Sequence, residues 1–247
     1  MTAFWITYVA FVAIIAARYL AIAGLFHWLL WHRPDEKVRA ERLAKQRPEH
    51  RAIRHEILMS LLSSFIYALP TAIAIEIWKG GGTAIYSSVD SLWGWIYIPV
   101  SMFIYFAAND TFFYWTHRAM HHPRLYSVMH RTHHKSKQPT PWAAFSFHPT
   151  EAALEAWLLP VMTLFVPIHI SAALAVLMLM TLTSVLNHAG WEVMPRGWMR
   201  GWGGRHIITA THHNMHHTRF KGNYGLHFRF WDKLMNTDIM VQPELSK

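Results

Sequence analysis

The sequence predicts an all-α integral membrane protein with about four transmembrane helices, the last of them a hairpin, and a helical cap on one membrane face. Three observations lead to this fold class. The chain of 247 residues is 53% hydrophobic and only 15% charged, whereas average usage is about 25% charged. Several apolar runs are long enough to cross a bilayer, which takes a helix of roughly 20 residues. Nearly all basic residues lie between those runs, and the length predicts a single domain, 1–247.

Four apolar stretches predict the membrane-crossing elements in chain order. Single spans are expected at Phe4 to Trp31, Ile57 to Trp78 and Leu92 to Trp115. The first run follows no basic segment and is too long for a signal peptide, so we expect it to be retained. The stretch from Ala152 to Leu186 contains Pro160 and Pro167. It predicts either two short spans or a re-entrant hairpin with a turn near Pro167.

The distribution of basic residues predicts the orientation. Of 23 Lys and Arg residues, 21 fall in Arg33–Arg54, His117–Thr150 and Pro195–Lys247. The positive-inside rule places these segments in the cytoplasm and the Lys79–Ser91 loop on the far side. We therefore expect a cytosolic helical cap, in the inner membrane if the source is bacterial and in the endoplasmic reticulum if it is eukaryotic. The net charge of +9 suggests a nucleic-acid partner, but the hydrophobicity and the placement of the charges favour the lipid membrane.

Histidines supply the main functional signal. Ten of the nineteen lie in two tracts, 117–134 and 212–217, and the chain has no cysteine. Thiolate ligands, disulfides and iron–sulfur clusters are therefore excluded within the chain. The tracts contain H-x-x-x-H once and H-x-x-H-H twice, at spacings that share a helix face. Imidazole suits Fe, Zn, Cu and Ni, and eight or more converging imidazoles exceed the four ligands of a structural zinc site. The pattern therefore indicates two metal ions.

Further polar residues near these tracts are candidates for the same site. Asp110 lies on the predicted face of His117 and His121, where we expect its carboxylate to orient a ligand imidazole. His121 fits that face better than His122, but a site with wider spacing would use His122. Pro123 is expected to break this helix, and a second helix ending at Pro139 would carry the next group of histidines.

Three more histidines and one amide have less defined roles. His148 is expected to be a ligand, a substrate-gating residue or a structural residue at the start of the next helix. His188 returns to the predicted depth of the clusters and is a candidate ligand, with Asn187 as a neighbouring donor. His212 precedes the last tract and is a weaker candidate than His213. The remaining histidines, His227 among them, have no partner spacing, and we expect them to be interfacial or solvated.

At these residues the chain resembles the fatty acid hydroxylase/sterol desaturase superfamily. The resemblance rests on three histidine boxes in order, HRAMH, HRTHH and HNMHH, which follow a predicted span. The segments PTPWAAFSFHP, NHAGWE and HHTRFKGNYGLHFRFWDKLMNT are similar to those of sterol C-5 desaturase-type members. The similarity covers roughly Asn109 to Thr237.

The resemblance implies a non-haem di-iron centre that uses O2 to hydroxylate or desaturate a lipid, which could be sterol-like, a carotenoid or an acyl lipid. It implies a separate electron donor of the ferredoxin or cytochrome b5 type. The basic face could attract such a donor or could instead adhere to anionic lipid headgroups. The implied ligands are His117, His121, His130, His133, His134, His213, His216 and His217, with His188 as an additional histidine.

Two other classes of function remain open from the residues alone. A membrane zinc metallohydrolase would require a carboxylate beside the metal, as in H-E-x-x-H, and the boxes contain none. A metal or haem transport protein would place histidines along several spans, whereas these gather on one face. Neither the substrate nor the choice between hydroxylation and desaturation follows from the sequence.

Overall fold

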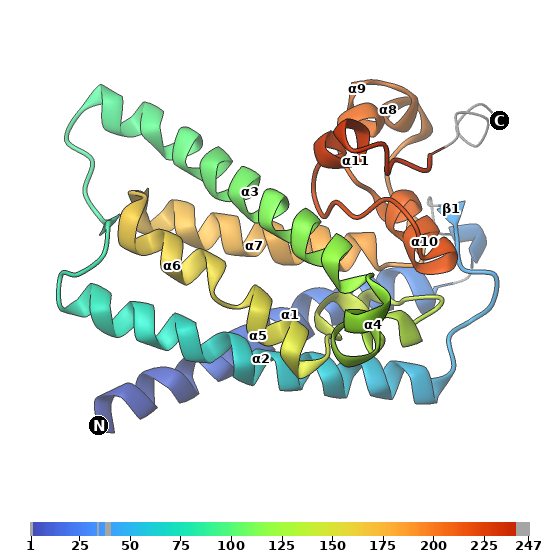
Figure 1. Ribbon diagram of the computed structural model, residues 1–247, viewed down its shortest axis with the longest axis horizontal. Coiled ribbons are helices and arrows are strands. Elements are labelled where there is room, and N and C mark those ends of the chain that lie inside the picture. Colours follow the sequence, from blue (N-terminus) through green and yellow to red (C-terminus); the bar gives the residue numbers. More distant parts are fainter. Residues whose placement is uncertain (1, 34, 38–40, 241–247) are drawn as a thin grey trace.

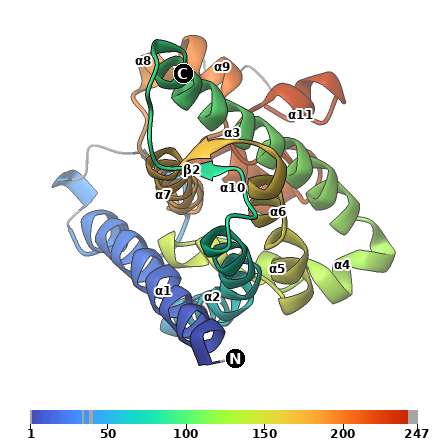
Figure 2. The same ribbon diagram turned by 90° about the vertical axis from the view of Figure 1, so that its left-hand side faces the viewer.

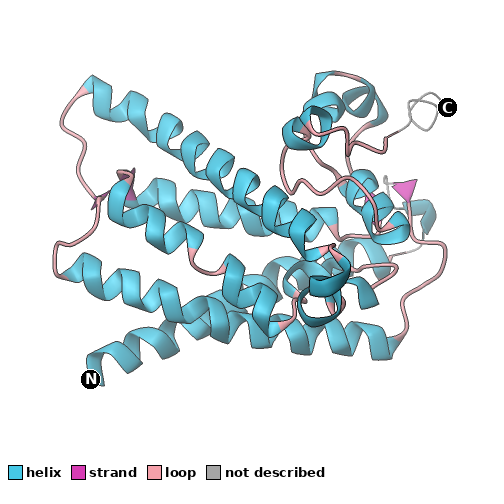
Figure 3. Ribbon diagram, viewed as in Figure 1, coloured by secondary structure: helices cyan, strands magenta, loops and turns pink. Residues whose placement is uncertain are grey.

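Helices form nearly all of the regular structure in the computed structural model (Figures 1 and 3), which describes residues 2–33, 35–37 and 41–240. The α-helices are α1 Thr2–Trp31, α2 His50–Lys79, α3 Leu92–Met120, α4 Pro123–Met129, α5 Pro149–Glu155, α6 Leu158–Phe165, α7 Ile170–Asn187, α8 Arg196–Arg200, α9 Trp202–His206, α10 Ala210–Arg219 and α11 Phe230–Leu234. Four two-residue strands are β1 Glu41–Arg42, β2 Ile85–Tyr86, β3 Ile168–His169 and β4 Trp191–Glu192. Three short 3₁₀ helices are Asp35–Lys37, His133–Lys135 and Pro141–Phe145.

Four of these helices, α1, α2, α3 and α7, are long and apolar enough to cross a membrane. Their outer faces expose large apolar side chains, such as Ile6 at 71% and Phe103 at 64%. Such surfaces are stable only against lipid, because exposing apolar area to water is unfavourable. Viewed along the bundle, α7 lies between α1 and α3, and α6 packs between α2 and α3 (Figure 2). The predicted all-α membrane fold is confirmed.

The stretch between the third span and the last histidine tract folds as a hairpin. It is built from α5, α6 and α7, with the reversal at Val166 to His169. There β3 pairs in parallel with β2, which follows α2, so the turn lies beside the Lys79–Ser91 loop at the far end of the bundle. The predicted break near Pro167 is therefore present, and the chain returns along α7 to the end that holds the histidines.

Polar contacts at that end attach the loops to the bundle. Tyr19 of α1 and Ser60 of α2 both donate hydrogen bonds to the carbonyl of Trp142, at 2.8 and 3.0 Å. The indole N–H of Trp31, the last residue of α1, donates to the carbonyl of Ala189 at 3.1 Å. These bonds satisfy buried backbone groups that lie outside regular structure. They fix the segments that follow the second histidine box and α7.

The second histidine box departs from the predicted long helix. Pro123 does begin a helix, but α4 ends at Met129, and His130 is its C-terminal cap. The chain then turns, and His133 and His134 lie in a short 3₁₀ helix. A 3₁₀ helix has a tighter rotation per residue than an α-helix. Neighbouring side chains in this turn therefore point in directions that α-helical spacing does not predict.

Candidate metal centre

Nine buried or half-buried imidazoles converge at one end of the bundle in two groups. The ligand nitrogens within each group all lie within 4.8 Å of one another. The five-histidine cluster comprises His117, His121, His130, His134 and His216. The four-histidine cluster comprises His133, His188, His213 and His217. The two clusters are adjacent, because the rings of His134 and His217 have centroids 4.7 Å apart.

Each cluster gathers side chains from elements far apart in the sequence. The end of α3 supplies His117 and His121, and the turn after α4 supplies His130, His133 and His134. One face of α10 supplies His213, His216 and His217. The C-terminal cap of α7 supplies His188. All nine metal-ligand histidines of the sequence prediction are thus brought together, five in one group and four in the other.

The nitrogens that face one another are the Nε2 atoms, at distances of 2.9 to 3.3 Å. In the five-histidine cluster His117 and His130 are 2.9 Å apart, and His134 lies 3.1 Å from His216. In the four-histidine cluster His213 lies 2.9 Å from His188. Metal–imidazole bonds of about 2.0–2.1 Å at angles of 90° to 109° would separate neighbouring ligand nitrogens by about 2.9 to 3.4 Å. The spacing therefore fits the edges of metal coordination polyhedra.

In three of the rings a backbone carbonyl holds the opposite nitrogen, which determines the tautomer of those rings. Nδ1 of His117 donates to the Tyr224 carbonyl at 2.8 Å, and Nδ1 of His216 donates to the Gly222 carbonyl at 2.9 Å. Nδ1 of His188 donates to the Ser184 carbonyl at 2.7 Å. A neutral imidazole carries one N–H, so each of these rings presents an Nε2 lone pair to the cluster. Facing lone pairs repel one another unless they share a cation.

Burial keeps these rings neutral, which is the state that binds metal. Burial, followed by the field of His121, lowers the pKa of His216 to about 3. Burial lowers the pKa of His188 to about 4, against the opposing effect of its hydrogen bond to Ser184. The pKa of His121 is lowered to about 4, also by burial. At neutral pH each of these rings therefore offers a lone pair.

Three other candidate histidines lie outside both clusters and act as helix caps. His122 begins α4, and its Nδ1 accepts from the Arg124 N–H at 3.4 Å. His148 begins α5 and hydrogen-bonds Thr150. His212 forms a capping box with Thr209 at the start of α10. Side chains at these positions satisfy the free N–H groups of a helix N-terminus. The described structure thus places His122, His148 and His212 at helix starts and outside both clusters.

Asp110 and Asn187 contact a backbone loop instead of an imidazole. Oδ1 of Asp110 accepts from the N–H groups of Leu226, His227 and Phe228, at 3.3, 2.7 and 3.1 Å. The amide of Asn187 donates to the Leu226 carbonyl at 2.9 Å. In the described structure neither side chain hydrogen-bonds a clustered imidazole directly. They fix the loop that follows Tyr224, whose carbonyl holds His117.

His227 is also placed differently from the sequence prediction. It is buried, 4% exposed, and its Nδ1 lies 3.1 Å from Thr183 Oγ1 of α7. It is therefore neither interfacial nor solvated. Local sequence spacing could not predict this burial, because the contact partner Thr183 lies 44 positions earlier in the chain.

Sequence reasoning missed one acidic residue at the site, Glu151. This residue is fully buried in the first turn of α5, and its Oε1 lies 2.7 Å from Nδ1 of His130. Burial raises the pKa of the Glu151 carboxyl and lowers that of His130, so in the chain by itself the contact is a neutral hydrogen bond. The available signal was the acidic residue in FSFHPTE, two positions after a proline that begins a helix.

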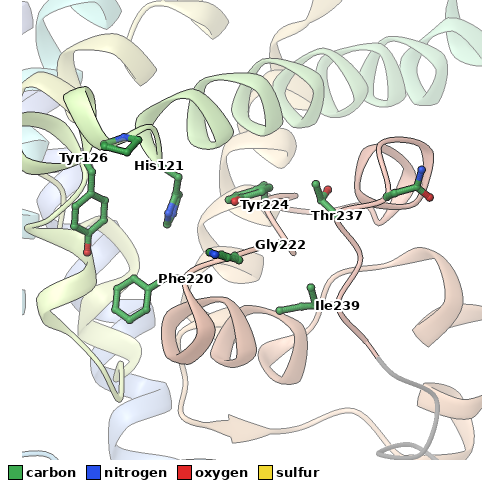
Figure 4. Close-up of a pocket in the computed structure, with 10 residues that line it drawn as sticks. His121, Tyr126, Phe220, Gly222, Tyr224, Thr237 and Ile239 are labelled. Carbon is green, nitrogen blue, oxygen red and sulfur yellow. The ribbon is translucent and has the colours of Figure 1, made fainter.

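A pocket of about 880 Å³ adjoins the five-histidine cluster. His121 is the one clustered imidazole, within the described chain, that is not fully buried, and it lines this pocket. Tyr126, Phe220 and Tyr224 supply aromatic surface around it, and Ile239 supplies aliphatic surface (Figure 4). The arrangement gives an apolar molecule a route to the edge of the five-histidine cluster at His121.

The fold and the clusters define an integral membrane protein with a buried, histidine-rich site for metal binding. The model of the fatty acid hydroxylase family matches residues 102–237, which include every clustered histidine. The chain therefore belongs to the fatty acid hydroxylase/sterol desaturase superfamily.

Several curated proteins are similar to the chain. It is 30% identical over 208 residues to Delta(7)-sterol 5(6)-desaturase ERG3B of Gibberella zeae, covering 81% of this chain and 62% of that protein. It is 31% identical over 186 residues to Delta(7)-sterol 5(6)-desaturase erg3C of Aspergillus fumigatus, covering 67% of this chain and 56% of that protein. It is 28% identical over 186 residues to lathosterol oxidase of Rattus norvegicus, covering 74% and 60%. The chain thus spans about three fifths of the length of these relatives, and no solved structure matches it.

Proposed function

We propose that this protein is a membrane di-iron oxidoreductase that uses O2 to desaturate or hydroxylate a sterol-like lipid. Hydroxylation converts a C–H bond, O2, two electrons and two protons into C–OH and one water. Desaturation removes two hydrogens from adjacent carbons and releases two waters for the same input. The names of the relatives favour desaturation of a sterol. Carotenoids and acyl lipids are the alternative substrates.

One observation carries the proposal, namely two adjacent groups of imidazoles whose Nε2 atoms face one another, with the tautomer of three rings set by backbone carbonyls. Nine imidazoles with no thiolate suit iron, zinc, copper or nickel, and zinc supplies no redox chemistry. Iron bound there would supply activation of O2 and removal of hydrogen from an unactivated carbon. The carbonyls of Tyr224, Gly222 and Ser184 would hold three of the ligand rings in place.

The lining of the pocket supports a lipid substrate. Tyr126, Phe220 and Tyr224 offer apolar faces, while Lys221, Asn236 and Thr237 add polar groups to the same lining. A lipid with an apolar body and a polar group would bury the first against the aromatic rings and leave the second near the polar residues. A filled pocket would also keep water away from the half-buried edge of His121.

Electrons would come from a separate ferredoxin or cytochrome b5-type protein on the cytoplasmic side. The segments His117–Thr150 and Pro195–Lys247 each carry a net charge of +5, which favours an acidic partner. Cysteine introduced at exposed Ser87 should label from outside, and cysteine at exposed Gln46 should label only after permeabilisation. The chain has no native cysteine to interfere. The reverse pattern of labelling would contradict this orientation.

The geometry favours neither of the other classes of function. A zinc hydrolase needs a carboxylate on the reacting side of the metal, whereas Glu151 contacts His130 at Nδ1, the nitrogen that faces away from the cluster. A transport path needs polar groups along the spans, whereas the nine clustered imidazoles gather at one end of the bundle.

The direct test combines metal content with product analysis. Protein loaded anaerobically with iron(II) should hold two irons per chain. With O2 and a reducing system it should convert a Δ7-sterol into a product that has lost two hydrogens or gained one oxygen, as read by mass spectrometry. The His216→Ala variant is the inactive control. A fully loaded enzyme that changes neither this sterol nor any extracted membrane lipid would contradict the proposal.

A further inference from the structure

Glu151 is held at the five-histidine cluster by a short series of contacts. Proline at position 149 begins α5, with His148 as its cap. Thr150 Oγ1 donates to the Val128 carbonyl at 2.8 Å, which ties this turn to α4 just before His130. Glu151 then points inward and is 0% exposed, with Oε1 2.7 Å from Nδ1 of His130. Its other oxygen, Oε2, is buried and has no hydrogen-bond partner among the described residues.

A buried carboxylate oxygen without a partner is costly, because burial removes its hydration. A stability role alone does not explain the residue, since an apolar side chain would avoid this cost. The arrangement is consistent instead with a carboxylate that is compensated when a cation binds on the opposite side of His130. Bound cations are often the largest charges in a site and dominate its electrostatics.

The acceptor on His130 differs in kind from the others at the site. The clustered imidazoles with an identified acceptor at Nδ1 are His117, His130, His188 and His216, and three of these four donate to backbone carbonyls. A carboxylate is a stronger acceptor than a carbonyl, by about twofold in hydrogen-bond energy when it is ionised. It draws the Nδ1 proton away from the ring and makes Nε2 a more basic ligand. His130 belongs to the five-histidine cluster, so this support acts on one of the two metals.

We propose that Glu151 is a positioning residue for the five-histidine site: its carboxylate fixes His130 with Nε2 toward the metal, gives that ring anionic character, and so strengthens metal binding at this site alone. The inference rests on the proposed metal centre. Beyond that centre, it assigns the two sites different metal affinities, and it attributes the difference to Glu151, a residue outside the histidine boxes. A more anionic ligand also favours the higher oxidation state, so the metal beside His130 should be the more easily oxidised for a given ligand number.

The test is competition for iron(II) between a chelator and the full-length protein in detergent, with the Glu151→Gln variant. Glutamine keeps the shape and removes the charge. One of the two irons should be held about 10- to 100-fold less tightly, the usual loss for such outer partners, and the other should be unchanged. The reduction potential of the weakened iron should rise. Glu155→Gln is the matched control, because Glu155 lies one turn further along α5 and accepts from Thr116 Oγ1 at 2.8 Å, and among the described residues it has no hydrogen bond to a clustered imidazole.

The possible outcomes separate the inference from the proposed function. Equal retention of both irons in Glu151→Gln and the unaltered protein would overturn the inference. A parallel loss of both irons would also overturn it, because that indicates a role in folding. If Glu151→Gln does not fold, Glu151→Asp decides: it keeps the charge at a greater distance, so a smaller loss confined to one iron is expected, and any other pattern overturns the inference. Failure of the unaltered protein to bind two irons would overturn the metal centre itself.

Discussion

The five-histidine cluster meets a pocket through half-buried His121, whereas all four imidazoles of the four-histidine cluster are buried. The first has a carboxylate behind His130, while the second has backbone groups behind its rings, such as the Ser184 carbonyl behind His188. Histidine imidazoles thus form two sites that differ in their exposure to a pocket and in the acceptors that hold the rings from behind. The comparison teaches that counting ligands does not describe such a centre. The atoms behind the rings and the free space beside them distinguish one site from the other.

The largest expected effect comes from removing one ligand from either cluster. His134→Ala in the first cluster and His213→Ala in the second should each lower turnover more than about 100-fold, since even loss of an outer partner costs 10- to 100-fold. Each variant should lose one iron of two, as measured by metal analysis alongside turnover. His50→Ala, at an exposed position, is the control. Substantial turnover in only one of the two ligand variants would mean that a single cluster performs the reaction.

Acid should destabilise both clusters in the same direction. The pKa values of His188, about 4, and His216, about 3, lie below the ordinary value of 6.5 because the rings are buried. Their stabilising contribution is therefore complete above pH 6.5 and declines as the pH falls toward 4 and 3, by up to about 1.4 kcal/mol per pH unit for each ring. Chemical denaturation of chelator-treated protein from pH 7.5 to 4 measures this decline. A free energy of unfolding that stays constant over this range would contradict the burial of the rings.

Two glycines with positive φ lie in turns next to the clusters, one beside each, so that each metal site can be perturbed by a separate substitution. Gly222 has φ +80° and Gly190 has φ +71°, and an added Cβ would lie 2.3 Å from the Thr237 carbonyl oxygen or 2.8 Å from the Trp31 ring. Each change to alanine should cost about 1–3 kcal/mol of unfolding free energy. Gly222→Ala should weaken the iron at the five-histidine cluster, because its carbonyl holds His216. Gly190→Ala should weaken the iron at the four-histidine cluster, because it follows His188.

Gly81→Ala is the matched control for this pair. Its φ is also positive, +76°, but a Cβ there meets nothing within 4 Å. It should add backbone strain in the far-side loop and leave both irons unchanged. If Gly222→Ala and Gly190→Ala weaken the same iron, the assignment of these two turns to separate clusters is wrong.

The smallest effect should come from filling the pocket beside His121. Ile239→Trp places a large ring in the lining and should lower kcat/KM about tenfold, equivalent to about 1.4 kcal/mol, with iron content unchanged. Val128→Trp adds the same ring at a 54%-exposed position outside the lining, and turnover should be retained. Steady-state kinetics on both variants tests the contrast in access. Full activity in Ile239→Trp would indicate that substrate approaches the clusters by another route.

Sequence patterns predicted the spans, the hairpin and the identity of the converging histidines. The length of the apolar runs predicts the spans, and the position of the prolines predicts the hairpin. The histidine spacing in α10 predicts part of the converging set. The division into five and four could not be predicted, because the adjacent residues His133 and His134 enter different clusters from a 3₁₀ turn. The contacts of Asp110 and Asn187 could not be predicted either, because their partners lie in a loop 116 and 39 positions away. Packing between distant segments leaves no trace in local periodicity.

The order of the clustered histidines along the chain has a consequence for biogenesis. The histidines on α10 follow the four membrane-crossing helices identified in the described residues, and both clusters include them. Neither cluster can therefore be complete until these four helices have been synthesised. If the proposed iron centre forms, metal capture follows synthesis of the bundle, and cells starved of iron should accumulate an inserted, metal-free form that a later supply of iron activates.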